Sequence, residues 1–349
     1  MALTKVSTGV VDMSGDTGGL VIAKGTDAQQ PTCDASILGS IRENTTKNKV
    51  EACTSTGWRF LEEVGSTAAP LIVDYLIVGG GGAGASGYGG VQGGSGGGGG
   101  FITSLPGGSG GGSSSESPFP LTVGTQYAVT VGSGAASVYT LTPGQPTSGG
   151  DSSVFNSFTA LGGGSSRSYT SGNTKNSAGR FLYASGGGGT YTGGPGGSGP
   201  GSGNAASRGY DGGNGTHGVF YGGGGGGAGG LGSNTVGGAG KLNAITGNTS
   251  LSYSGGGGNS WGNPRGGAGQ SSQSGGNGFS GVANTGGGGG GGLYNGGNGG
   301  NGGSGVVILR YPNSYTTTKT NTLISSVSTS VAGYKIETFT SGTGTITFA

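Results

Sequence analysis

Charged side chains are scarce in this sequence, and their scarcity restricts its partners. Only 8% of its 349 residues are charged, against about 25% in an average soluble domain, and the formal net charge is +2. A nucleic-acid-binding protein needs a patch or stripe of Lys and Arg to neutralise phosphates, and no such stripe is present. We therefore expect no nucleic-acid partner.

Metal-binding residue types are nearly absent. His217 is the only histidine, and Cys33 and Cys53 are the only cysteines, so a zinc site built from Cys and His is not expected. We predict no metal and no cofactor. The two cysteines can form a disulfide that closes a loop of about twenty residues, worth roughly 3 kcal/mol. They can equally stay as free thiols in a particle that is assembled in the cytoplasm.

Long hydrophobic runs are also absent. No stretch approaches the roughly 20 apolar residues that a membrane-spanning helix requires, so we expect no membrane insertion. Residues 1–6 lack the apolar core of a secretory signal peptide. A protein that is assembled inside a cell and released by lysis needs no such signal.

Glycine is the residue that the sequence has in excess, with 97 copies. Gly loses the most backbone entropy on folding and has no side chain to pack, so it cannot build a conventional core. Disordered linkers are usually Gly and Ser alone or highly charged, whereas Tyr, Phe, Leu and Val interrupt these tracts. We predict an ordered all-β fold with extensive irregular, polyglycine-II-like structure and essentially no helix.

One glycine segment has a three-residue repeat. Residues 298–303 read Asn-Gly-Gly twice, and a polyproline-II helix has three residues per turn. In that geometry Asn lies on one edge and bare backbone on the other two, so such helices can pack backbone against backbone. The strict glycine at every third residue that collagen requires is absent from the rest of the tracts, which excludes a triple helix.

Composition divides the chain into four parts. Residues 1–65 hold half of the charged residues and ordinary strand sequence, with a predicted β-hairpin around a polar turn at 44–48. A lone hairpin is marginal, so we expect this part to attach or oligomerise. The other parts are a glycine-rich domain (66–312), a Ser/Thr-rich connector (313–333) and a C-terminal β-hairpin (334–349).

Two apolar strands bracket the glycine-rich domain. The runs at 69–78 and 305–312 are rich in Val, Ile and Leu, and we expect them to pair and close the base of the domain. The C-terminal hairpin has too few apolar side chains to bury itself. We expect it to add to the sheet beside one of these strands, in its own subunit or in the next.

Two motifs of enzymes occur in the sequence, and both are expected by chance in a chain with 97 glycines. The segment 79–84 matches the dinucleotide-binding pattern, but no helix can follow it to hold a pyrophosphate. The segment 93–97 matches a hydrolase elbow, which also needs a following helix. The acids of the glycine-rich part are isolated in sequence: Glu116, Asp151 and Asp211. We expect no enzyme activity.

The inserts between glycine tracts carry most of the side-chain chemistry. Tyr, Trp and Arg are enriched at binding hot spots, and the inserts with such residues beside polar neighbours are our candidates for receptor binding: Tyr169, Tyr191, Tyr210, Trp261 and Arg265. The alternative is that these aromatic residues fill the few apolar gaps of a fold with little core.

The N-terminal part resembles a module of phage tail-fibre and tail-associated proteins. The matching pieces are Gly-Ser-Ile-Arg-Glu-Asn-Thr-Thr (39–46), Lys-Val-Glu (49–51) and Gly-Trp (57–58). Glu43 stands where the module usually has Tyr. The resemblance implies attachment to other tail or virion proteins through residues 1–65.

Residues 73–312 resemble the glycine-rich domain of phage and marine-microbial surface proteins. The matching pieces are 73–78, 127–132, 149–155 and 303–312. The resemblance implies β-rich fibres and host recognition. In such proteins a strand pair like that of 334–348 usually precedes the first bracketing strand, so the order here is circularly permuted.

These observations predict a virion (phage tail) fibre protein or adhesin that attaches to a host surface glycan or outer-membrane protein. We expect a homo-oligomer, with a trimer favoured, located in the virion tail or else at a cell surface. The alternative is a structural subunit of an extracellular filament or a virion decoration without a receptor site. Aromatic inserts that cluster at one tip favour the adhesin, and inserts spread along subunit contacts favour the filament.

Overall fold

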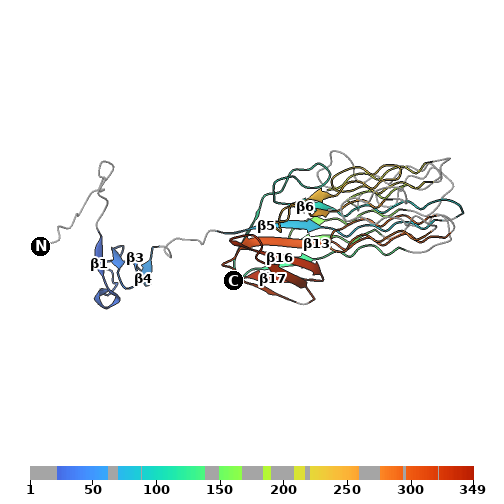
Figure 1. Cartoon of the computed structure of the whole chain (residues 1–349). Helices are drawn as coiled ribbons and strands as arrows, with labels where there is room; N and C mark the ends of the chain where they lie inside the picture. The colour runs from blue at the N-terminus through green and yellow to red at the C-terminus, as the bar shows by residue number, and fades with distance from the viewer. Residues whose placement is uncertain are drawn as a thin grey trace, which may run out of the picture. The chain divides into compact units, whose positions relative to one another are not determined.

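The structure is a computed structural model of the whole chain. It describes residues 22–61, 70–87, 89–137, 149–166, 184–189, 208–216, 221–258, 276–293, 296–320 and 322–349. The chain separates into two compact units, residues 1–69 and 70–349 (Figure 1). The regular secondary structure of the described residues consists of strands and a single 3-10 turn at Asp27–Gln29. It includes no helix long and apolar enough to cross a membrane.

The first unit contains a four-stranded sheet in the order β1-β2-β3-β4. The strands are β1 (Ala23–Gly25), β2 (Ile41–Asn44), β3 (Lys49–Thr54) and β4 (Gly57–Phe60). β2 and β3 form the hairpin that the polar turn predicts, and Asn48 takes a positive φ of 51° there. Trp58 packs on it: its indole N–H donates to the Pro31 carbonyl at 2.7 Å, and the Arg42 guanidinium lies 5.8 Å from its ring centre.

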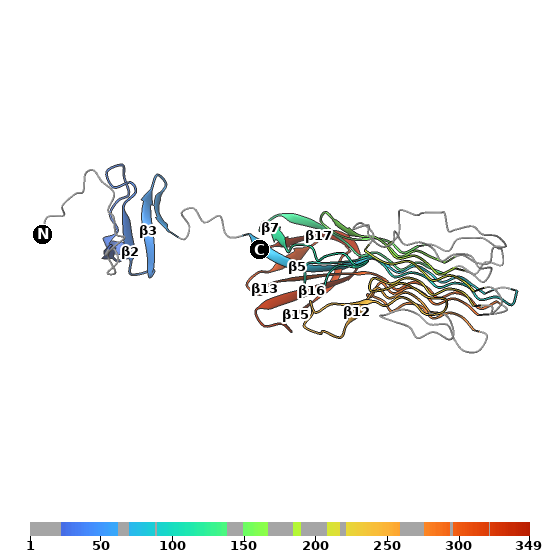
Figure 2. The same ribbon diagram turned by 90° about the horizontal axis from the view of Figure 1, so that it is seen from above.

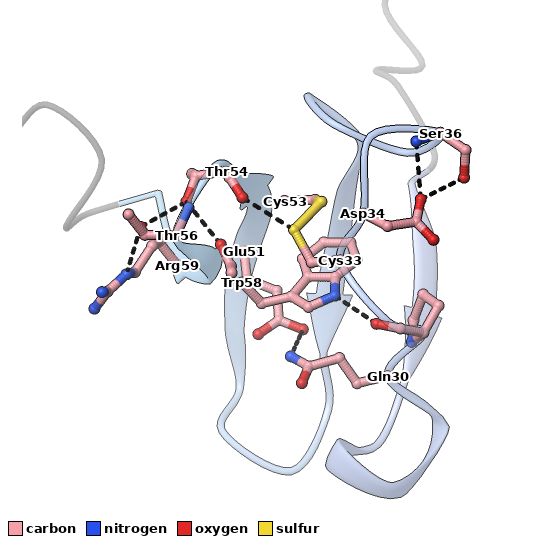
Figure 3. Close-up of a disulfide and its surroundings, with 12 residues drawn as sticks. Gln30, Cys33, Asp34, Ser36, Glu51, Cys53, Thr54, Thr56, Trp58 and Arg59 are labelled. Carbon is pink, nitrogen blue, oxygen red and sulfur yellow. Dashed lines mark hydrogen bonds between the residues drawn. A yellow bond between two sulfur atoms is a disulfide. The ribbon is translucent and has the colours of Figure 1, made fainter.

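A disulfide between Cys33 and Cys53 ties the segment before the hairpin to β3 (Figure 3). The sequence left this pairing open. Beside it, Gln30 donates to the Glu51 carboxylate at 2.8 Å, and the buried Arg42 pairs with Glu51 at 3.3 Å. These contacts cover one face of a sheet that has few apolar side chains of its own.

The second unit has two main sheets, which lie together at one end of the glycine tracts (Figure 2). One follows the order β15-β16-β13-β5-β6, with β7 also paired to β5, and the other follows β10-β9-β8-β17-β14; β11 and β12 pair separately. The strands are β5 (Leu71–Val78), β6 (Phe101–Thr103), β7 (Phe119–Leu121), β8 (Gln126–Thr130), β9 (Ser153–Phe155), β10 (Phe158–Ala160), β11 (Lys241–Leu242), β12 (Ser252–Tyr253), β13 (Val306–Pro312), β14 (Thr317–Lys319), β15 (Ile324–Ser328), β16 (Tyr334–Ser341) and β17 (Thr343–Phe348).

The two bracketing strands, β5 and β13, pair antiparallel at the centre of the larger sheet, as expected. One set of alternate side chains, including Tyr75 and Ile77, packs against the smaller sheet. The opposite set, including Leu76 and Val78, packs under Phe101 in a second cluster. Burial on both faces explains why these strands are nearly continuous apolar runs.

The C-terminal residues do not form the predicted hairpin. β16 pairs with β13 and β15, whereas β17 pairs with β8 and β14 in the other sheet. Gly342, at a φ of 98°, lies between them, and its carbonyl accepts the Val131 amide at 2.9 Å. The chain therefore changes sheets at this corner. The predicted connector 313–333 also differs, because it contains β14 and β15.

The glycine tracts form a polyglycine-II-like lattice beyond the sheets. Tract 79–87 donates to tract 92–100 at every third residue, through amides 79, 82 and 85, at 2.8–3.0 Å. It donates to tract 296–305 through amides 81, 84 and 87, at 2.8–2.9 Å. The alternation between neighbours follows from three residues per turn. Each tract is thereby bonded sideways to several others.

The Asn-Gly-Gly repeat has the predicted geometry. On tract 296–305, glycines 299 and 302 face tract 79–87 so closely that an added Cβ would overlap its carbonyl groups. Glycines 300 and 303 face tract 276–282 in the same way. Asn298 and Asn301 occupy the third edge, which leaves room for side chains.

Candidate functional site

Of the five predicted binding residues, the structure describes Tyr210. Tyr169, Tyr191, Trp261 and Arg265 lie outside the described residues. Tyr210 is half-buried, and its main chain belongs to the lattice: its amide donates to Gly227 at 3.0 Å and its carbonyl accepts from Gly186 at 3.0 Å.

Tyr210 lies near the sheets. Its neighbour Arg208 accepts the Phe101 amide at 3.3 Å through its carbonyl, and Phe101 begins β6. The Arg208 side chain forms an ion pair with Glu116. In sequence, Arg-Gly-Tyr reads as an insert between tracts, whereas in the structure the backbone of Tyr210 is bonded to two tracts of the lattice.

Three tracts are bonded around one buried serine. Ser95 is fully buried, and its carbonyl accepts the Gly188 amide at 2.7 Å. The next carbonyl, of Gly96, accepts the Gly257 amide at 2.9 Å. The Ser166 hydroxyl donates to the Gly188 carbonyl at 2.8 Å. We name these five residues the Ser95 ring.

Ser95 also holds two further tracts. Its amide donates to the Gly223 carbonyl at 3.0 Å, and its hydroxyl accepts the Gly291 amide at 3.2 Å. It is the only residue other than glycine in 93–100, which is the one signal in the sequence that could have pointed to it. Because a polyproline-II helix rises about 3.1 Å per residue, the ring lies roughly 19 Å from the start of β6.

The Ser95 ring joins three tracts whose described residues run to Ser166, Gly189 and Gly258. Three of the predicted binding residues, which lie outside the described residues, follow these positions within three residues of the sequence: Tyr169, Tyr191 and Trp261. We take the ring as the base of the candidate site because its tracts are the described residues next to these candidates in sequence.

The ring itself is uncharged, so it offers hydrogen bonding and support for side chains rather than chemistry. Among the residues that the structure describes, no group of three or more His, Cys, Asp or Glu side chains is placed to hold a metal ion. What the arrangement can do is hold several tracts together as a rigid base.

Asp211, next to Tyr210, is an acid of the lattice whose burial is not fully offset by hydrogen bonds. One of its carboxylate oxygens is buried without a hydrogen-bond partner, and burial raises its pKa above the ordinary 3.8. A raised carboxyl pKa destabilises the folded state at every pH above the folded pKa, and this penalty disappears below pH 3.8, where the unfolded chain is protonated too.

Asp211→Asn is therefore expected to raise stability at pH 7, because it removes the desolvated charge and keeps the shape. The gain should shrink as the pH falls through the raised pKa and vanish below pH 3.8. Thermal unfolding of both proteins across this pH range measures it. Asp151→Asn, at an exposed acid of the same lattice, is the control. A loss of stability at pH 7 would contradict the assignment.

A comparison with known protein families identifies the family of this chain. The family model for a glycine-rich domain matches residues 64–312, which is more than half of the chain. The protein therefore belongs to the glycine-rich domain family, and the glycine-rich part of the resemblance in the sequence is confirmed. No curated protein matches the chain.

Proposed function

We propose that this protein is a non-enzymatic adhesin of a virion tail fibre that attaches to a host surface glycan or outer-membrane protein. The observation that carries the proposal is the Ser95 ring, because it bonds together three tracts that precede, in sequence, inserts with aromatic candidates. Loop-mounted Tyr and Trp give large contact area at low entropic cost.

Position in the sequence supports a common binding region. Tyr169, Tyr191 and Trp261 are each two or three positions beyond Ser166, Gly189 and Gly258, respectively. Ser166, Gly188 and Gly257 belong to the Ser95 ring. The three aromatic candidates therefore follow, in sequence, tracts that are neighbours in the lattice.

Replacing Tyr169, Tyr191 and Trp261 together with Ala is expected to abolish binding to host cells while the fold persists. Truncation of one hot-spot residue costs about 2 kcal/mol or more. Binding of labelled protein to cells measures the loss. The matched control replaces an exposed aromatic residue elsewhere, Tyr334, and should bind like the wild type. Cell binding that survives the triple change would refute the proposed site.

The first unit, residues 1–69, is proposed to attach the protein to other virion proteins and to drive homo-oligomerisation, with a trimer favoured. Three of its apolar side chains are exposed and would be covered by a partner: Leu38, Ile41 and Leu61. The second candidate function is a filament subunit or virion decoration without a receptor. For that function, the triple variant would leave assembly and cell association unchanged.

A further inference from the structure

The outer tracts of the glycine lattice carry side chains at positions where inner tracts have bare backbone. On tract 276–282, Phe279 and Val282 are 56% and 55% exposed. They are three residues apart and so share one edge of the polyglycine-II helix. Glycines occupy the edge of this tract that faces tract 286–293, where an added Cβ would overlap the carbonyl groups of the neighbour: Gly278 and Gly281.

Side chains also take part in the bonds between neighbouring tracts. Three bonds, of 2.7–2.8 Å, run from a backbone amide to a side chain of another tract: Ser137 to Asn301, Asn284 to Ser304 and Asn298 to Asn277. Each joins segments that backbone bonds already hold together, from Gly302 to Ala135, from Gly286 to Ser304 and from Gly278 to Asn298. These polar side chains therefore face occupied edges of the lattice, in contrast to the exposed Phe279 and Val282.

Steric contact decides what this edge can accept. Neighbouring tracts pack so closely that their facing edges must be glycine. A tract that presents Phe279 and Val282 therefore cannot take another tract at lattice spacing. In the described structure, the amides of Phe279 and Val282 have no hydrogen-bond partner, so only the side chains close this edge.

We propose that the outward side chains of tract 276–282 form a lateral cap that confines the lattice to one chain, and that the partner they exclude is the glycine tract of a second copy of this protein. We define the lateral cap as Phe279 and Val282. The cap is independent of the proposed receptor. It disfavours a filament that grows by adding tracts to this side, because such a filament would need bare edges.

The test removes the two side chains of the cap. Phe279→Gly combined with Val282→Gly in the full chain opens one lattice edge whose amide donors are free. We expect this variant to self-associate, and light scattering over a concentration series should show at least twice the mass of the wild-type species. The control, Leu242→Gly with Leu251→Gly, removes two exposed apolar side chains outside the tracts and should leave the mass unchanged.

The expected result is opposite to that of a hydrophobic docking surface, whose loss would reduce self-association. An unchanged or smaller mass of the Phe279/Val282 variant therefore overturns the cap. Hydrogen exchange of amides 79–100 confirms that the lattice is intact. If the double variant loses that protection, Val282→Gly alone is measured in the same way. A larger mass of that variant then supports the cap, and an unchanged mass overturns it.

Discussion

Gly82→Ala is expected to unfold the glycine lattice. Gly82 lies in tract 79–87, and its amide donates to the Gly97 carbonyl at 2.8 Å. A Cβ at this position would overlap the Gly164 carbonyl group, with its carbon at 2.5 Å and the Gly163 oxygen at 2.9 Å. Both contacts are backbone, so no side chain can move aside. The tracts themselves would have to separate.

Two opposing effects decide whether Gly82→Ala stabilises or destabilises the fold. Replacing Gly with Ala restricts the unfolded chain and normally stabilises by about 0.4–1 kcal/mol where the backbone permits it. Overpacking a rigid interior costs about 1–3 kcal/mol, and more where the neighbours cannot move. Because Gly82 is bonded into tracts on several sides, we expect the steric cost to dominate, with a loss of at least about 3 kcal/mol.

Gly230→Ala is the matched control for this prediction. A Cβ at Gly230 would lie 3.6 Å from the Ala239 nitrogen, which is ordinary van der Waals contact. This variant should therefore be neutral or slightly more stable than the wild type. Denaturant unfolding of all three proteins gives the comparison, and equal stability of the two variants would show that the lattice spacing is wrong.

The parts of the fold that the sequence predicted are those governed by local period. The apolar runs at 71–78 and 306–312 predicted paired strands because β-branched residues favour strands. Each run holds one charged residue, and these two, Asp74 and Arg310, form an ion pair at 2.6 Å across the paired strands. The Asn-Gly-Gly repeat at 298–303 predicted its own geometry because three residues make one turn. Both signals lie within a few neighbouring residues.

Long-range contacts were beyond the reach of such reasoning, and Glu337 is an example. The alternation of β16 places Glu337 on the same face as Phe339, as the sequence indicates, but its burial depends on four donors from other strands. Glu337 is fully buried and accepts bonds of 2.8–3.1 Å from the side chains of Tyr311, Thr317, Lys319 and Ser325. Burial also raises the pKa of Tyr311 to about 12.

The same difference between local sequence signals and long-range contacts applies to the candidate site. The types of residue that suit binding could be chosen from the inserts in the sequence, but which tracts are neighbours in the lattice could not be predicted. The Ser95 ring joins residues as far apart as Ser95, Gly188 and Gly257. A spacing of this kind leaves no local pattern in a chain with 97 glycines.

Truncation after Pro312 is expected to unfold the second unit within each monomer. The deletion removes β14 to β17, which pair with strands of the same chain in both sheets. Three fully buried side chains leave the core between the sheets with them: Phe339, Ile346 and Phe348. At about 1.5–3 kcal/mol for each buried side chain, the loss is comparable to the whole stability of a typical domain, about 5–15 kcal/mol.

Two companion variants make this result interpretable. Deleting residues 1–69 removes the other compact unit and should leave the unfolding transition of residues 70–349 unchanged. Phe348→Ala keeps the chain complete but leaves a cavity beside Tyr311, whose ring lies 5.1 Å from that of Phe348. Such a substitution costs about 3–5 kcal/mol. Its destabilisation can be measured even if the truncated protein aggregates.

Calorimetry and light scattering on the three proteins decide between local and exchanged strands. If β16 and β17 complete their own subunit, truncation abolishes the cooperative transition of each monomer. If copies exchange them, truncation breaks an oligomer and leaves folded monomers. A chain that ends at Pro312 and remains folded, assembled and as heat-stable as the full protein would show that β16 and β17 contribute nothing to the core. That outcome would contradict the burial of Phe339 and Phe348.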